Sequence, residues 1–217
     1  QGFGNAIHAS QKKHGQIHQQ DALERVILHA LSDPIWHPGR FAFTIGQNQR
    51  NTQEDRMSNL DLAAEVGALL KERGETVAVS ESSAGGLVSA NLLSISGASK
   101  YFLGGGVIYT YDARERILGV SDEDMKGLRS SSEPYAMLCA RTMRAKMGAT
   151  WGLAETGASG PTGNRYGDAA GHTCLAVSGP VERVITLETA DNDREANMWR
   201  FTKAALDLLL ACVKEKG

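Results

Sequence analysis

The chain predicts an α/β layered fold, because helical and strand-like patterns alternate from residue 57 to the C-terminus. Apolar residues recur at helical spacing in several segments, and short runs rich in β-branched residues lie between them. Glycine-containing stretches separate most of these segments. With 217 residues, 41% of them hydrophobic, the chain is long enough for one domain with a real core and an appendage.

Residues 1–56 differ from the remainder, and we predict that they form a partly irregular N-terminal extension. Five of the six histidines lie here, without the spacing that metal ligands need. The pattern predicts a helix over residues 21–31, a short strand over 41–45 and a polar linker over 48–56. The main domain is therefore predicted over residues 57–217.

The first half of the main domain predicts helix, strand, helix, strand and a short helix. Ser58 can cap the first helix, and Gly74 ends it. A β-branched run follows, and two glycines open the next helix. The second strand is rich in glycine, and Gly119 ends the short helix. In order, these elements span residues 58–73, 76–80, 86–94, 104–110 and 113–118.

The second half predicts a helix, three strands and a final helix. Pro134 suits the first turn of a helix that begins at Glu133. The strand that follows runs into a second glycine-rich loop, residues 156–164. Two further apolar runs precede a long helix. In order, these elements span residues 133–147, 150–155, 173–177, 184–187 and 194–214.

Composition narrows the functional classes. Lys and Arg number 23 against 25 Asp and Glu, and this balance argues against a nucleic-acid-binding surface. No apolar run approaches the roughly 20 residues of a membrane span. Cys139, Cys174 and Cys212 lie far apart in apolar segments, which indicates reduced, buried thiols in a cytoplasmic protein. The chain begins with Gln and lacks a signal-peptide pattern, so we expect a fragment or a processed product.

Two loops rich in hydroxyl groups and glycine follow strands, at residues 81–86 and 156–164. In open α/β sheets, ligands bind where the carboxyl ends of strands meet such loops. We expect hydroxyl groups from both loops and the phenol of Tyr109 to converge there, where they suit phosphate or carbonyl oxygens. The alternative for residues 81–86 is an ordinary strand–turn–helix joint with a serine N-cap. Neither loop has the spacing of a P-loop or a Rossmann fingerprint.

A serine nucleophile also needs a base. His172 is the only histidine of the main domain, so a Ser-His-Asp triad would depend on it alone. The alternative is a Ser–Lys or Ser–Tyr pair, in which an amine or a phenol takes the proton. The cations that follow Tyr109 are Arg114 and Arg116, and arginine stays charged, so it can hold an anion but is a poor base.

Six segments in this order resemble the CinA C-terminal domain family, the nicotinamide mononucleotide (NMN) deamidases. The family's Glu-Ser-Cys-Thr-Gly-Gly is similar to residues 81–86, and its Pro-Gly-Ser-Ser-x-x-Phe-x-Gly-Gly to residues 96–105. Its Tyr-Ser-Asn-Glu-Ala-Lys, followed by Leu-Gly-Val, resembles residues 109–120. Its Ser-Glu-Pro, Thr-Gly-Ile-Ala-Gly-Pro and Gly-Asp-Arg segments are similar to residues 132–134, 156–161 and 192–194. The resemblance covers about residues 58–213.

The resemblance implies a three-layer α/β/α fold with a mixed, mostly parallel sheet. It also implies a homo-oligomer that hydrolyses the carboxamide of NMN, a small-molecule nucleotide, to nicotinic acid mononucleotide and ammonia. No metal or other cofactor, nucleic acid or membrane partner is implied. The catalytic positions carry over to Ser82 as nucleophile, Tyr109, and Arg114 in the place of the family's lysine. The substrate-binding positions are Ser83, Gly85, Gly86, Thr156, Gly157, Ser159, Gly160 and Arg194.

Three departures from the family pattern bear on the chemistry. Arg114 replaces the lysine that is the family's expected proton acceptor, Ser83-Ala84 replaces Cys-Thr, and residues 164–168 replace the usual loop after Gly-Pro. Tyr109 or Lys100 is then an alternative base. The chain could also act on a different amide, or bind a pyridine nucleotide without catalysis.

Overall fold

The computed structural model describes residues 47–216, with side chains from Ser58 onward. These residues belong to one compact unit, Ile45–Gly217. The helix predicted over residues 21–31 and the strand predicted over 41–45 lie outside the described residues.

A five-stranded sheet with the order β2-β1-β3-β4-β5 forms the centre of the unit. The strand β1 pairs in parallel with β2 and β3, whereas β4 pairs antiparallel with β3 and β5. Four strands thus point the same way and β4 runs against them, which confirms the expected mixed, mostly parallel sheet. The strands are β1 (Val77–Glu81), β2 (Phe102–Val107), β3 (Trp151–Ala158), β4 (His172–Ser178) and β5 (Arg183–Glu188).

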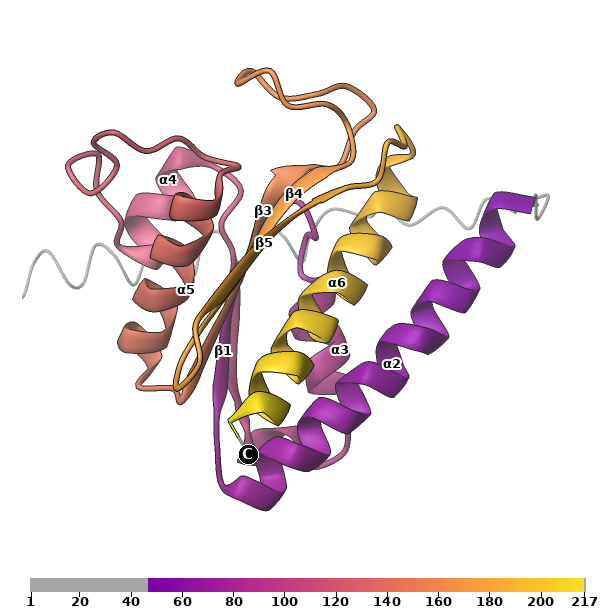
Figure 1. Cartoon of the computed structure of the whole chain (residues 1–217), viewed down its shortest axis with the longest axis vertical. Helices are drawn as coiled ribbons and strands as arrows, with labels where there is room; N and C mark the ends of the chain where they lie inside the picture. The colour runs from indigo at the N-terminus through magenta and orange to yellow at the C-terminus, as the bar shows by residue number, and fades with distance from the viewer. Residues whose placement is uncertain (1–46, 217) are drawn as a thin grey trace, which may run out of the picture. The chain divides into compact units, whose positions relative to one another are not determined.

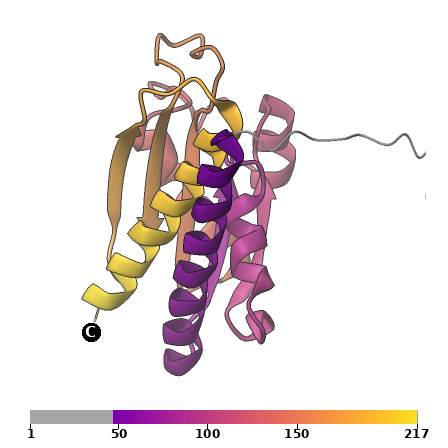
Figure 2. The same ribbon diagram turned by 90° about the vertical axis from the view of Figure 1, so that its right-hand side faces the viewer.

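Helices cover both faces of this sheet and give three layers (Figure 1). One face carries α2 (Gln47–Arg73), α3 (Leu87–Ser94) and α6 (Arg194–Glu215), and Figure 2 shows α2 and α6 lying side by side in front of the strands. The other face carries α4 (Tyr111–Ala113), the π-helical turn η2 (Arg114–Leu118) and α5 (Glu133–Met147). A short 3₁₀ turn, η1 (Ala98–Lys100), follows α3.

Successive side chains of each strand point to opposite faces of the sheet, and two separate hydrophobic cores result. Val77 and Val79 of β1 point into the core with α2 and α6, whereas Ala78 points into the core with α5. The α5 side is lined by small residues, and a Cβ at Gly152 of β3 would lie 2.1 Å from the carbonyl oxygen of Ala140. The glycine is therefore required for α5 to pack this closely on the sheet.

The element boundaries agree with the sequence pattern to within two residues except at three places. Helix α5 has the expected bounds, but α2 begins at Gln47, so the linker predicted over residues 48–56 is helical and Ser58 lies inside the helix. That segment contains neither glycine nor proline, and its polar composition concealed its helicity. Strand β2 spans Phe102–Val107 rather than residues 104–110, because its pairing with β1 begins at Phe102 and ends at Val107, the partner of the last β1 residue, Glu81. Strand β3 extends to Ala158 because it pairs along its length with β4.

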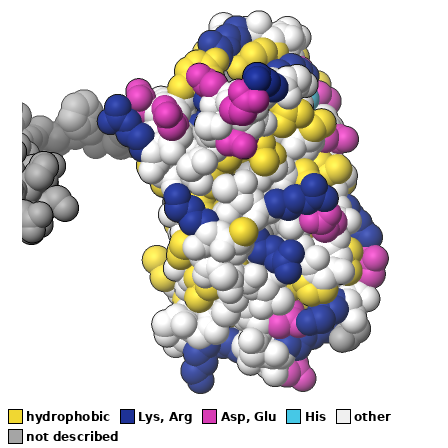
Figure 3. All heavy atoms as spheres, turned by 90° about the vertical axis from the view of Figure 1, so that its left-hand side faces the viewer, with side chains coloured by type: hydrophobic (Ala, Val, Ile, Leu, Met, Phe, Trp, Pro, Cys, Tyr) yellow, Lys and Arg dark blue, Asp and Glu magenta, His cyan; other side chains and the backbone are white. Residues whose placement is uncertain are grey.

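Surface features agree with an ordinary globular exterior. On the face in Figure 3, Lys and Arg are interspersed with Asp and Glu, and hydrophobic side chains are scattered among them. Within residues 47–216, no helix is long and apolar enough to cross a membrane. The three cysteines are free and buried, as expected.

Candidate active site

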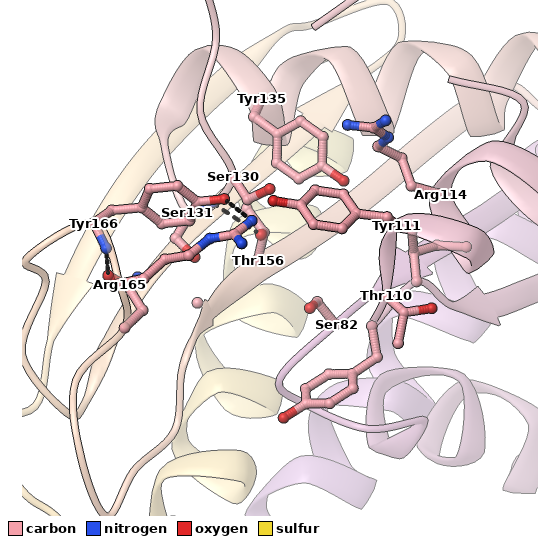
Figure 4. A pocket seen from close by; sticks show the side chains of 14 residues that line it. Ser82, Thr110, Tyr111, Arg114, Ser130, Ser131, Tyr135, Thr156, Arg165 and Tyr166 are labelled. Atoms are coloured by element: carbon pink, nitrogen blue, oxygen red, sulfur yellow. Dashed lines mark hydrogen bonds between the residues drawn. The ribbon is translucent and has the colours of Figure 1, made fainter. Parts of the chain in front are cut away.

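A cavity of about 400 Å³ lies where β1 and β3 end (Figure 4). Ser82, directly after β1, and Thr156, near the end of β3, both line it. Because these strands are parallel neighbours, their carboxyl ends meet at the same edge of the sheet. The remaining walls come from the segment after β2, the segment before α5 and the loop after β3. They include Tyr109, Tyr111, Arg114, Ser131, Tyr135, Gly157, Asn164, Arg165 and Tyr166.

A second cavity, of about 240 Å³, shares Tyr109, Gly157 and Asn164 with the first. Its walls are the glycine-rich loop after β3, the N-terminal end of α6 and the turn after β1. The predicted site residues that line it are Ser83, Gly157, Ser159, Gly160 and Arg194. The structure thus brings all the predicted positions except Gly85 and Gly86 to two adjoining cavities, while their roles stay predictions.

The turn that carries Ser82 is held by Glu155, a buried residue of β3. Its carboxylate accepts hydrogen bonds from the backbone N–H groups of Ser82 (3.0 Å) and Ala84 (2.8 Å). The hydroxyls of Ser83 (2.5 Å) and Thr173 (2.9 Å) donate to the same carboxylate. Four donors leave Glu155 little freedom, so the carboxylate fixes the nucleophile corner as a rigid turn.

A second buried carboxylate, that of Glu81, closes the N-terminus of α3. It accepts hydrogen bonds from the N–H groups of Gly86, Val88 and Ser89, at 2.9 to 3.0 Å. Burial raises the pKa of Glu81, against the effect of these hydrogen bonds. The N-terminus of α3 is therefore occupied by a carboxylate of the chain itself, and Gly86 lines neither cavity.

The glycine-rich loop is tied to the start of α6. Arg194 donates to the carbonyl oxygen of Gly160 (2.6 Å) and to the phenol oxygen of Tyr109 (3.3 Å). Asn197 donates to the carbonyl oxygen of Ser159 (2.9 Å). Tyr109, which is 60% exposed, therefore lies between the two cavities, and its phenol oxygen accepts a hydrogen bond from the Arg194 guanidinium group.

Arg114 takes part in structure more than the sequence suggested. Its side chain is buried, pairs with Asp122 and lies 5.3 Å from the Tyr111 ring centroid. In Figure 4 its guanidinium group points away from Ser82. Lys100 lies in η1, before β2 and at the opposite end of the sheet from Ser82, so it is excluded as the base. No lysine lines either cavity in the part of the chain that the structure describes.

His172 is buried but lines neither cavity. Its Nδ1 lies 2.5 Å from a carboxylate oxygen of Glu188, and its Nε2 lies 3.0 Å from the carbonyl oxygen of Ser131. Burial disfavours the charged ring, but these two hydrogen bonds and the nearby carboxylates outweigh it, and the pKa of His172 is raised. With both ring nitrogens engaged by acceptors, His172 is not the base of a triad with Ser82.

The loop after β3 forms the outer wall of the first cavity. The Arg165 guanidinium lies 4.8 Å from the ring centroid of Tyr111 and 5.0 Å from that of Tyr166. Asp168 fixes the loop through two hydrogen bonds that its carboxylate accepts from the Arg129 guanidinium group, at 2.6 and 3.0 Å. No carboxylate lines either cavity among the described residues, so both have an electropositive lining.

Sequence reasoning gave no role to Glu81, Glu155, Ser131 or the residues around Arg165. A charged residue at or near the end of a buried apolar strand was the available signal for the two glutamates. The contacts of Ser131 and Arg165 join segments distant in the chain and leave no local pattern. No group of three or more His, Cys, Asp or Glu that could hold a metal ion occurs in the described part.

Comparison with known proteins gives one consistent result. A family model described as “CinA C-terminal domain” matches residues 59–213. A CinA-like protein of Nostoc sp. is 38% identical over 132 residues, covering 61% of this chain and 31% of the relative. A CinA-like protein of Gloeobacter violaceus is 37% identical over 150 residues, which cover 68% of this chain and 35% of the relative. The chain therefore spans about a third of the length of these relatives.

Solved structures of similar fold have nearly the length of the described unit. The competence or damage-inducible protein from Enterobacter asburiae has a TM-score of 0.67 at 26% identity, covering 71% of this chain and 98% of that one. The competence damage-inducible protein A from Klebsiella pneumoniae has a TM-score of 0.69 at 24% identity, covering 73% and 99%. This second likeness shows the shared α/β fold alone.

Proposed function

Because the chain belongs to the CinA C-terminal domain family, we propose that it hydrolyses the carboxamide of NMN to nicotinic acid mononucleotide and ammonia. The activity is the one that the sequence resemblance implies. The observation that carries it here is the cavity in which Ser82 and Thr156 meet, beside a second cavity bearing Arg194. This division suits a substrate with a reacting amide at one end and a phosphate at the other.

The reaction in this proposal is acyl transfer through Ser82. The Ser82 oxygen attacks the amide carbon, and the tetrahedral intermediate collapses as ammonia leaves with a proton. Water then attacks the serine ester and releases the carboxylic acid. The rigid turn held by Glu155 supports this step, because an oriented nucleophile needs no reorganisation in the transition state.

Tyr109 is the group that we assign to proton transfer. It lines both cavities, and its oxygen accepts a hydrogen bond from Arg194, which leaves the phenol proton free for exchange with substrate or solvent. Tyr135, another phenol of the first cavity, is unsuitable because burial raises its pKa. Arg114 pairs with Asp122 and, as an arginine, is a poor base, so it does not take this role.

Arg194 and the glycine-rich loop are the phosphate site of this proposal. A guanidinium group binds phosphate with two parallel hydrogen bonds, and Arg194 has no carboxylate partner among the described residues. An Arg194→Ala variant is expected to bind NMN at least tenfold more weakly, since a charge-assisted bond contributes about 1.5–3 kcal/mol. Unchanged affinity in isothermal titration calorimetry would remove this assignment.

A non-catalytic nucleotide-binding protein is the second candidate. The observation that favours it is the site's chemistry: Arg114 is paired with Asp122, and no lysine lines either described cavity. Such a protein would bind NMN without consuming it. An amidase for a different small amide is distinguished from both by its substrate range.

Ammonia release from NMN by the full chain separates these candidates. Ser82→Ala should abolish release, while Ser94→Ala, a serine-to-alanine change at the far end of α3, should leave it unchanged. Binding of NMN without ammonia release, even at high protein concentration, would favour the second candidate. Release from other carboxamides but not from NMN would favour a different amidase.

A further inference from the structure

Ser131 has an unusual backbone conformation for a serine. Its φ of 54° lies in the left-handed region, and the residue is buried in the wall of the Ser82 cavity. Residues other than glycine adopt this backbone region only where the surrounding structure enforces it. Something must therefore hold Ser131 in place.

Two basic side chains, those of His172 and Arg129, hold the carbonyl group of Ser131. His172 Nε2 lies 3.0 Å from the carbonyl oxygen, and Arg129 Nη1 donates to it at 3.1 Å. On the other side of the residue, the Ser131 N–H donates to Thr156 Oγ1 at 3.3 Å. The residue thus connects a buried histidine to a hydroxyl group of the cavity.

The direction of the Thr156 hydroxyl proton follows from this contact. The Ser131 N–H occupies a lone pair of Thr156 Oγ1, so the hydroxyl's own proton must point elsewhere. Thr156 lines the cavity that contains Ser82, where a substrate oxygen is the available acceptor. Few backbone donors of this corner remain for the substrate, because the N–H groups of Ser82, Ala84 and Gly86 are already bound to buried carboxylates.

We propose that His172, held as an imidazolium between Glu188 and the Ser131 carbonyl, is a positioning residue that makes Thr156 a hydrogen-bond donor to the substrate carbonyl oxygen. The inference rests on the proposed amide hydrolysis. It assigns His172 no contact with substrate. Its effect passes through Ser131, from which Thr156 receives its hydrogen bond.

The charges around His172 support this state. The Glu188 carboxylate of β5 contacts Nδ1, and Asp168 Oδ2 lies 3.8 Å from Nε2. The Cys174 Sγ of β4 lies 3.6 Å from Nε2. The cation nearby is Arg129, which donates to the Ser131 carbonyl oxygen. The two carboxylates raise the pKa of His172 despite its burial. A neutral ring has a single N–H, so loss of the proton would either leave Glu188 without its donor or leave the Ser131 carbonyl with Arg129 as its remaining donor.

The pH dependence of ammonia release gives the first test. It is measured for the full chain and for three variants that each carry one substitution to glutamine. His172→Gln should lower kcat by about 10- to 100-fold with little change in KM, because a small displacement of a reacting contact has that effect. Glu188→Gln, at a side chain that is 56% exposed, should move the alkaline fall of kcat to lower pH. Glu182→Gln, in the Arg141 ion pair near the far end of β4, is the matched control and should follow the wild type. An alkaline fall that Glu188→Gln leaves in place would overturn the proposal.

Nuclear magnetic resonance gives a test that does not need activity. In the wild type, both ring N–H signals of His172 should be present at neutral pH, and the Ser131 amide signal should follow their loss as the pH rises. In Glu188→Gln the same transition should occur at lower pH. A Ser131 amide signal that stays unchanged while the His172 ring N–H signals are lost would overturn the inference. Wild-type protein that shows the coupled titration but releases no ammonia would instead retire the proposed hydrolysis.

Discussion

At the residue scale, the main feature is a pair of buried carboxylates beneath the Ser82 corner. Glu81 and Glu155 accept seven hydrogen bonds between them from the surrounding backbone and hydroxyl groups. A neutral amide cannot replace such a carboxylate, since its NH₂ group would face donors. The site therefore depends on charges that never reach the substrate.

We expect Glu155→Gln to lower the free energy of unfolding by about 2–4 kcal/mol, because a buried donor is left unsatisfied and a charged acceptor is lost. Urea denaturation followed by circular dichroism measures the change. Glu123→Gln, at a largely exposed side chain, is the control and should stay within about 0.5 kcal/mol of the wild type. A Glu155→Gln protein as stable as this control would show that the four hydrogen bonds are dispensable.

Position 114 permits a direct test of the missing lysine. Arg114→Lys should raise the rate of ammonia release at alkaline pH, because a buried lysine can lose its proton whereas an arginine cannot. Arg114→Met, which keeps the length but has no proton acceptor, should not raise it. Equal rates for the two variants would mean that another group, such as Tyr109, transfers the proton.

At the element scale, the loop after β3 determines the outer wall of the site. Asp168 joins it to the segment before α5 through Arg129, and Asn164 donates to the same carboxylate at 2.8 Å. The hydrogen bond from Arg129, opposed by partial burial, lowers the pKa of Asp168. The stabilisation is therefore present above the ordinary aspartate pKa of 3.8 and is lost as the pH falls through the lowered value.

We expect Asp168→Asn to free this loop while leaving the sheet intact. Amide hydrogen exchange in residues 161–170 should become faster, while β1 and β3 keep their protection. Asp207→Asn, in an exposed ion pair on α6, is the control for removing a surface carboxylate. Unchanged exchange in the loop would show that its aromatic contacts alone hold it.

Local patterns predicted these elements better than their contacts. The strand before Ser82 and the glycines after it mark the corner, because β-branched residues and two glycines have short-range preferences. Glu155 is a single charge in an apolar strand, and its partners, Ser82 and Thr173, lie 73 and 18 residues away. The sequence likewise contains His172 but not its Ser131 contact, which spans 41 residues. Such pairings arise only from the topology of the sheet.

At the scale of the whole molecule, β2 is an edge strand of the sheet that the described residues form. Leu103 and Val107 of this strand are 38% and 42% exposed. Ile117 and Met147, also partly exposed, adjoin the strand, since Cβ atoms at Gly106 and Gly104 would touch them. Apolar side chains beside unpaired strand groups favour association with another chain.

We therefore expect the homo-oligomer implied by the family resemblance to form through the β2 edge. Leu103→Lys should shift the protein to the monomer in size-exclusion chromatography with light scattering, because a buried lysine would lack a partner in a symmetric contact. Leu60→Lys on α2, where the leucine is 37% exposed, is closely matched in exposure and should keep the wild-type mass. If Leu60→Lys dissociates the assembly and Leu103→Lys does not, the interface lies on the helical face instead, and β2 is a free edge.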